Sequence, residues 1–392
     1  MTAEVAILNR NGVALASDSY GLVKIGDKKK FISVNKIFSL SQSHPIGIII
    51  SNFVNFMSTP WETIVSVYRS YIGEKSFNTL KEYTDNFISF LTSDKRFSAP
   101  LVEKLIIENA IDHCISEVSK SVKLTNDYTK SISNEIEKLL LFYSNQKFLI
   151  GFDDSFTKYF VEIHGKELEQ YIKMKPEINV DIKTQQNLIK LCAYIICKSN
   201  FIYDNYGSSG LVFVGYGDND IFPSLIGYNI FASIDKNLIY KTSASTTIGI
   251  DNKQAIYSFG VTDVLATYID GINPDLQNMV FKEIDSGFKD LTGTIQNKFQ
   301  LSEKDQGFLN SITVSAIDNF KNKFLDFQQK NCVEPLLLMV NMLSNQELLS
   351  LAESFVHLTL TKQKFSADEQ ISGGRIHVVS ITKGDGYWER YI

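Results

Sequence analysis

The chain has 392 residues, of which 44% are hydrophobic and 21% are charged, a composition typical of a folded globular protein. At about 150 residues per domain, this length allows two or three domains, or one domain with large insertions. The net charge of −5 excludes the broad positive surface of a general nucleic-acid binder. No run of about 18 apolar residues predicts a membrane span, and the N-terminus lacks a signal peptide's apolar segment. We therefore expect a cytoplasmic protein.

Cysteine and histidine are sparse and scattered along the chain. Cys192 and Cys197 form the closest cysteine pair, and no second pair or histidine stands near them. Zinc sites and disulfide frameworks need denser patterns. We expect reduced thiols in a core, and no metal or cofactor.

Strands are predicted first, over residues 3–8 and 13–16, on either side of Asn11-Gly12. Asn-Gly between two apolar runs is the strongest short hairpin signal. Residues 34–40 and 46–50 form a second predicted pair. Each of these runs is apolar on both faces, which favours strands buried in a sandwich over a half-exposed sheet.

Apolar residues then recur at helical spacing. This spacing predicts helices over 61–72 and 77–91, a mainly helical block over 95–209, a helix from 262 to 269 capped by Thr262, a second helical block over 273–344, and a helix over 348–356. Strands are predicted between these helices and at the end of the chain, over 211–215, 225–229, 255–258, 375–382 and 387–390. Strands joined by hairpins and separated by helical blocks indicate an α+β fold.

Thr2 is the first residue that could carry chemistry. Removal of Met1 would leave a hydroxyl and a free amine on adjacent carbons. An α-amine has a pKa of about 7.7–8.0, so it can accept the hydroxyl proton near neutral pH.

Asp18 and Lys36 lie at predicted strand ends and could assist Thr2. A lysine beside the hydroxyl would stabilise negative charge, and an aspartate would orient that lysine. A solvated ion pair at strand ends is the alternative interpretation.

Three separated segments resemble the β-type proteasome subunits of the N-terminal-nucleophile (Ntn) hydrolase superfamily. The first is TAEVAILNRNGVALASDS, followed by NKIFSL and PIGIIISN. The second is LVFVGYGDNDIFPSL, similar to the family's central hairpin. The third is DEQISGGRIHVVSITKGDGY, similar to its D-x-x-S-G-G segment and last hairpin. The resemblance covers the strand-bearing parts of the chain and leaves the helical blocks unexplained.

The resemblance implies a single domain over 1–392: a four-layer αββα sandwich with helical insertions at about 95–209 and 273–344. Thr2 matches the nucleophile, Asp18 and Lys36 match its two partners, and the backbone N–H near Ser51 matches the oxyanion donor. Ser372 and Glu369 match the residues that support the amine.

The chain departs from the family pattern at three places. Isoleucines and Ser51 replace the glycine of the oxyanion strand, and Glu369 replaces an aspartate, with Asp368 one residue away. Val261 stands where the family has a serine, and Thr262 or Asp263 would have to replace its hydroxyl.

The resemblance implies an N-terminal threonine hydrolase that cleaves peptide or amide bonds without a cofactor, and a homo-oligomer, either a ring or a dimer. Neither nucleic acid nor membrane is an expected partner. Two alternatives stay open. One is a catalytically inactive proteasome-like scaffold or binding protein, and the other is a hydrolase of small-molecule amides.

Overall fold

The computed structural model describes residues 3–25, 28–122, 128–175, 178, 180–366 and 372–391. The chain divides into two compact units. The first unit comprises residues 1–37, 221–224 and 246–392, and the second comprises 38–220 and 225–245. Each unit contains a five-stranded sheet together with helices. The α+β class is therefore confirmed in its broad form, whereas the single domain stays a prediction.

The sheet of the first unit is ordered β12-β1-β2-β13-β14, with antiparallel neighbours. Its strands are β1 (Ala3–Asn9), β2 (Val13–Asp18), β12 (Gln254–Gly260), β13 (Ile376–Thr382) and β14 (Gly386–Tyr391). The predicted Asn11-Gly12 hairpin joins β1 to β2, with Leu8 opposite Val13. The side chain of Asn9 accepts the N–H groups of Asn11 and Gly12, which fixes the turn.

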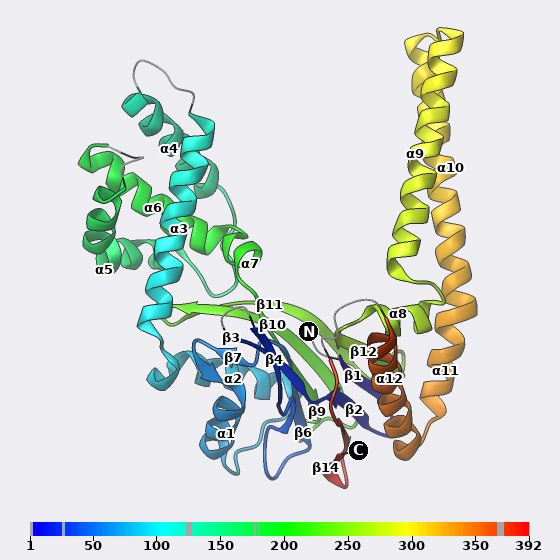
Figure 1. Ribbon diagram of the computed structural model, residues 1–392. Helices are drawn as coiled ribbons and strands as arrows, with labels where there is room; N and C mark the ends of the chain where they lie inside the picture. The colour runs from blue at the N-terminus through cyan, green and yellow to red at the C-terminus, as the bar shows by residue number, and fades with distance from the viewer. Residues whose placement is uncertain are drawn as a thin grey trace. The chain divides into compact units, whose positions relative to one another are not determined.

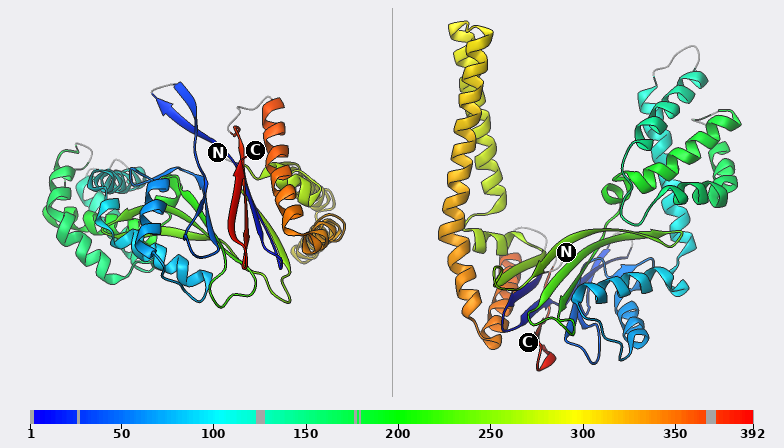
Figure 2. Two further views of the ribbon diagram at one scale, coloured as in Figure 1. Left: turned by 90° about the horizontal axis from the view of Figure 1, so that it is seen from below. Right: turned by 180° about the vertical axis from the view of Figure 1, so that it is seen from behind.

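One face of this sheet packs on α12 (Asn345–Phe365). Side chains alternate between faces along a strand, so Ala3, Val5 and Ile7 all point toward the helix side. Figure 2 shows α12 lying along the sheet. The alternate residues of β1, including Glu4, therefore occupy the other face.

A small hairpin follows β2, made of β3 (Tyr20–Ile25) and β4 (Lys28–Ser33). Sequence analysis missed it because its segments mix lysine and glycine with apolar residues. Phe31 and Ile32 of β4 are exposed.

The remaining helices of the first unit are α8 (Asp263–Asp270), α9 (Pro274–Phe299), α10 (Glu303–Gln328), η2 (Gln329–Val333, one π-helical turn) and α11 (Glu334–Met342). Helices α9 and α10 form a long antiparallel hairpin that extends away from the sheet of its own unit (Figure 1). Asn273 and Ser302 cap their N-termini through side-chain hydrogen bonds. Thr262 stands at the start of α8 as predicted, but its side chain makes no capping bond.

The sheet of the second unit is ordered β11-β10-β9-β6-β5. Its strands are β5 (Ile37–Ser39), β6 (Ile46–Asn52), β9 (Ser209–Gly215), β10 (Ser224–Ile234) and β11 (Asn237–Thr247), and a short pair is formed by β7 (Asn55–Phe56) and β8 (Thr59–Pro60). Sequence analysis missed β11, whose second half is rich in Ser and Thr. It also predicted β5 too long, over residues 34–40.

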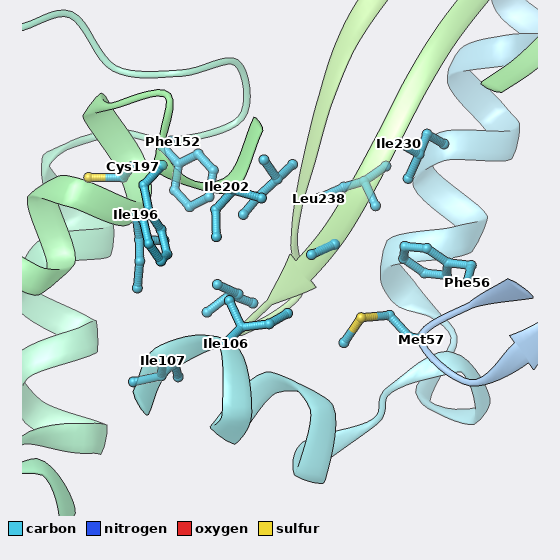
Figure 3. Packing of buried hydrophobic residues seen from close by; sticks show 14 of the residues in the cluster. Phe56, Met57, Ile106, Ile107, Phe152, Ile196, Cys197, Ile202, Ile230 and Leu238 are labelled. Carbon is cyan, nitrogen blue, oxygen red and sulfur yellow. The ribbon is translucent and has the colours of Figure 1, made fainter. Parts of the chain in front are cut away.

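Helices of the second unit are α1 (Trp61–Ile72), α2 (Leu80–Ser93), η1 (Lys95–Phe97), α3 (Pro100–Ser121), α4 (Tyr128–Ser144), α5 (Asp154–Lys173), α6 (Ile182–Lys198) and α7 (Phe201–Asn205). They share one apolar cluster with the sheet. In Figure 3, Ile106 of α3, Ile196 of α6 and Leu238 of β11 are drawn in this cluster. The block at 95–209 thus packs into the same core as the sheet of the second unit.

Both blocks predicted to be helical, 95–209 and 273–344, consist mainly of helices among their described residues. None of the described helices is long and apolar enough to cross a bilayer. Cys114, Cys192 and Cys197 are buried free thiols, as expected, whereas the free thiol of Cys332 is only half-buried. Burial raises the pKa of Cys197 to about 12, so this thiol stays neutral and is a poor nucleophile.

Candidate active site

Asp18, at the end of β2, accepts hydrogen bonds from four groups of the first unit. Its Oδ1 accepts from the Lys36 ammonium at 2.5 Å and from the Ala3 N–H at 2.9 Å. Its Oδ2 accepts from the N–H groups of Gly373 at 2.8 Å and Tyr20 at 3.3 Å. The carboxylate is fully buried. Asp18 therefore joins the start of β1, the segment before β5 and the segment before β13.

Lys36 precedes β5 and is almost completely buried, with 1% of its side chain exposed. Its ammonium lies 2.5 Å from Asp18 Oδ1 and 3.9 Å from Glu4 Oε1. A buried ammonium is tolerated when carboxylates and hydrogen bonds offset its desolvation. The predicted Asp18–Lys36 pair is therefore present, and it is a buried pair rather than a solvated one.

Glu4 is the residue of this cluster that sequence analysis missed. It lies on β1, its carboxylate is buried, and it is directly opposite Ser17 of β2. A signal was available, because Glu4 interrupts the apolar run A-E-V-A-I-L at a position that shares a strand face with residue 2. With Asp18 and Lys36 it makes a cluster of two carboxylates and one ammonium.

Thr2 and Glu369, the expected nucleophile and one expected support of its amine, lie outside the described residues. The described neighbour of Thr2 is Ala3, whose N–H belongs to the peptide bond that joins the two residues. That N–H donates to Asp18. The first described backbone N–H of the chain is thus held by the carboxylate that also holds Lys36.

Ser372 and the two glycines that follow it lie against the end of β2. Ser372 is fully buried, and its N–H and Oγ donate to Gln363 Oε1 of α12 at 3.0 and 2.5 Å. Gly373 donates to Asp18, and its carbonyl accepts the Ser19 N–H at 3.1 Å. At Gly374 φ is +84°, and a Cβ there would lie 2.4 Å from Ser19 Oγ. Glycine is required there by both conformation and space, and the structure brings Ser372 and Asp18 into one network.

The position with no matching hydroxyl, Val261, follows Gly260, which is paired with Ala3. Of the two proposed substitutes, Asp263 is bound by the Lys362 ammonium at 2.6 Å on the surface. Thr262 makes no capping bond to α8. No described contact assigns either of them to the amine-supporting role.

Ser51, the expected oxyanion donor, belongs to the second unit. It lies on β6 opposite Gly210 of β9, and its Oγ is 3.5 Å from the Gly210 carbonyl oxygen. A Cβ on Gly210 would lie 2.2 Å from that Oγ, so the serine occupies the space that glycine leaves. Its oxyanion role stays a prediction.

A second buried polar side chain lies on the same sheet, two strands away from Glu4. His377 of β13 is opposite Ser17 and stacks on Tyr391 at 4.1 Å between ring centroids. Burial lowers the pKa of His377, and Glu389, 3.2 Å from its Nε2, opposes that shift. Glu4, Ser17 and His377 therefore form a row across three adjacent strands.

Comparison with family models and with curated proteins finds no match for the chain. Within the described parts of the chain, no three His, Cys, Asp or Glu side chains gather as ligands for a metal ion. The Asp18–Lys36–Glu4 cluster lies at the start of the described part of β1, where Ala3 donates to Asp18. A buried ammonium held by carboxylates can stabilise negative charge on a neighbouring oxygen.

Proposed function

We propose that the chain is a hydrolase of peptide or amide bonds whose nucleophile is Thr2, exposed by removal of Met1. The observation that carries the proposal is the buried carboxylate of Asp18, which holds both the Lys36 ammonium and the N–H of the peptide bond after Thr2. The four-layer αββα sandwich and its resemblance to the Ntn hydrolases are part of this proposal.

The proposed reaction begins when Thr2 Oγ attacks the carbonyl carbon of the substrate and the α-amine takes the hydroxyl proton. Lys36 lowers the cost of negative charge on Oγ, and Asp18 and Glu4 keep the ammonium oriented. The tetrahedral intermediate collapses, the C–N bond breaks, and the amine proton passes to the leaving group. Water then adds to the Thr2 ester, and its cleavage releases the acid and restores the hydroxyl.

A catalytically inactive scaffold is the second candidate, and Val261 favours it. A valine cannot relay a proton, and the two nearest polar substitutes have no contact that assigns them this role. Retention of Met1 would also remove the free amine from Thr2.

The test is intact-protein mass spectrometry before and after treatment with an epoxyketone, a reagent that captures an N-terminal threonine through its hydroxyl and amine. We expect loss of Met1 and one covalent adduct. Thr2→Ala should abolish the adduct. Unprocessed Met1, or processed Thr2 without an adduct, would contradict the proposal.

Two lysine variants compare loss of the buried Lys36 charge with loss of a buried lysine elsewhere, and circular dichroism at the assay temperature checks that both variants are folded. Lys36→Met should abolish adduct formation, whereas Lys198→Met, at a buried lysine of the second unit, should retain it. Glu4→Gln should slow adduct formation about tenfold, which equals about 1.4 kcal/mol, because Lys36 keeps Asp18 but loses its second carboxylate. If the chain forms the adduct, its rates of hydrolysis of peptide and of small-amide substrates can then be compared. This comparison separates a peptidase from an amidase.

A further inference from the structure

Gln363 of α12 contacts the segment that precedes β13. It lies in the last turn of this helix, which ends at Phe365. Because α12 packs along the apolar face of the sheet, that core fixes the position of Gln363 relative to β2 and β13. The side-chain Oε1 of Gln363 accepts two hydrogen bonds from Ser372, one from its N–H at 3.0 Å and one from its Oγ at 2.5 Å.

The backbone N–H of Ser372 decides which way the Gln363 amide faces. A backbone N–H can only donate, so the amide atom that faces Ser372 is the oxygen rather than the NH₂ nitrogen. An amide oxygen carries no proton and can only accept. The hydroxyl of Ser372, at 2.5 Å from the same oxygen, is therefore the donor. The direction of this hydrogen bond follows from the covalent chemistry of the two groups.

This direction limits what the Ser372 hydroxyl can do next. A serine hydroxyl has one proton and two lone pairs. Since its proton is held by Gln363, Ser372 Oγ can act toward any further group only as an acceptor. Ser372 is fully buried, so bulk water does not compete with Gln363 for this proton.

Ser372 lies close to the start of β1. The next residue, Gly373, donates to Asp18 Oδ2 at 2.8 Å, and Asp18 Oδ1 accepts the N–H of Ala3 at 2.9 Å. Two hydrogen bonds to one carboxylate thus connect the segment after Ser372 with the first described residue of the chain. The proposed function requires, at this end of the chain, an amine that is free to accept a proton.

We infer that Gln363 is a positioning residue for the reaction proposed at Thr2, and this inference rests on that proposed function. By accepting the hydroxyl proton of Ser372, Gln363 leaves Ser372 Oγ as an acceptor for an N–H of the α-amine. The lone pair of the amine nitrogen then stays available to take the proton of Thr2 Oγ. If Ser372 instead donated to the amine, its O–H would occupy this lone pair, and the amine would lose its role as the base.

The charged side chains nearest this segment have partners of opposite charge or face solvent. They are Asp18, Glu4 and Lys36, which are joined through the Lys36 ammonium, Lys362, which binds Asp263 on the surface, and the exposed Arg375. Gln363 itself is neutral. Gln363→Glu therefore adds one negative charge beside the Ser372 hydroxyl and alters none of these groups.

The test is the rate of adduct formation with the epoxyketone, measured between about pH 5 and pH 9 so that the profile spans the titration of an α-amine. Gln363→Glu keeps the size of the side chain and both acceptor bonds, and its negative charge favours the ammonium form of a neighbouring amine. We expect the acid limb of the rate profile to move to higher pH by about one unit. The matched control is Gln346→Glu, at an exposed glutamine about 26 Å away along the same helix, and it should leave the profile unchanged.

A second set of variants separates positioning from a structural role. Gln363→Met removes the acceptor and should lower the rate about tenfold, and Ser372→Ala should lower it by a similar factor. In the Ser372→Ala background, Gln363→Met should cause no further loss, because no hydroxyl is left to orient. Circular dichroism checks that each variant is folded.

The outcomes distinguish this inference from the proposed function. If the wild-type chain forms the adduct and the Gln363 variants match its rate and profile, the inference is overturned and the proposed function stands. A further loss from Gln363→Met in the Ser372→Ala background would also overturn it, since Gln363 would then act through the Ser372 backbone alone. No adduct on the wild-type chain would overturn the proposed function and this inference with it.

Discussion

The two compact units bury different kinds of side chains. In the second unit, the core is an extensive aliphatic and aromatic cluster, to which Leu211 of β9 and the helices from α1 to α7 contribute. In the first unit, the sheet has a smaller apolar cluster on its α12 side, and it also buries Glu4, Asp18, Lys36 and His377.

Buried apolar residues and buried charged residues contribute to stability in different ways. Apolar burial stabilises in proportion to area, so each core residue of the second unit contributes on its own. Buried charges stabilise only as a satisfied set, so the loss of one member exposes the desolvation cost of the others. In the first unit, the desolvation cost of the buried charged residues is thus offset by their own contacts. Among the described buried residues of the second unit there is no comparable charged cluster.

The largest expected effect comes from breaking the charged set. Lys36→Met leaves two buried carboxylates without their counter-charge, and we expect it to lower the free energy of unfolding by about 3–5 kcal/mol. Urea denaturation followed by circular dichroism measures this loss. Lys198→Met is the control, since Lys198 donates to the Ser144 carbonyl and its ammonium lies over the Phe148 ring rather than between carboxylates. Equal losses in the two variants would contradict the contrast between the units.

A change of similar or smaller size is expected in the apolar core. Leu211→Ala removes a fully buried side chain, and we expect a loss of about 2–5 kcal/mol in the free energy of unfolding. Leu101→Ala, at a leucine that is 80% exposed in the same unit, should change it by less than about 0.5 kcal/mol. If the two substitutions cost the same, the second unit is not stabilised by the cluster described.

The smallest effect is a pH dependence carried by His377. Burial holds its pKa below the ordinary value of 6.5, so the unfolded chain binds this proton more readily than the folded chain. The contribution of the neutral imidazole to the free energy of unfolding is therefore complete above about pH 6.5. It decreases as the pH falls from there toward the lowered pKa of the folded chain. Urea denaturation at several pH values should show this decrease, and His377→Gln should reduce it. His357→Gln, at an exposed histidine, should leave the profile unchanged.

Local patterns predicted much of the fold. The hairpin at Asn11-Gly12, helices α1 and α12, and the final strand pair follow from turn chemistry and periodicity, because each depends on residues close in sequence. The elements missed include β3, β4 and β11. The β3–β4 hairpin mixes lysine with apolar residues, and β11 has only Leu238 and Ile239 in the core before a Ser- and Thr-rich second half. Their pairing partner, and not their composition, makes them strands.

The candidate site was predicted in part. Asp18, Lys36 and Ser372 were named from the resemblance. Lys36 and Gly373 both donate to Asp18, and Ser372, the residue before Gly373, donates to Gln363. Gln363 and Glu4 were not predicted. The apolar spacing along α12 predicts a helix but gives no role to a polar residue such as Gln363. Glu4 could be assigned to the site only from its distance of 3.9 Å to Lys36.

The sequence by itself determined the α+β class, the order of most elements, the reduced thiols and the identity of the Asp18–Lys36 pair, because these depend on composition, local period and motif. Tertiary structure alone decided that this pair is buried, that Glu4 lies beside it, and that α9 and α10 pair along a narrow seam. Such features depend on contacts between residues far apart in the chain, and the free energy of a buried charge or an exposed face is set by those neighbours rather than by the residue itself.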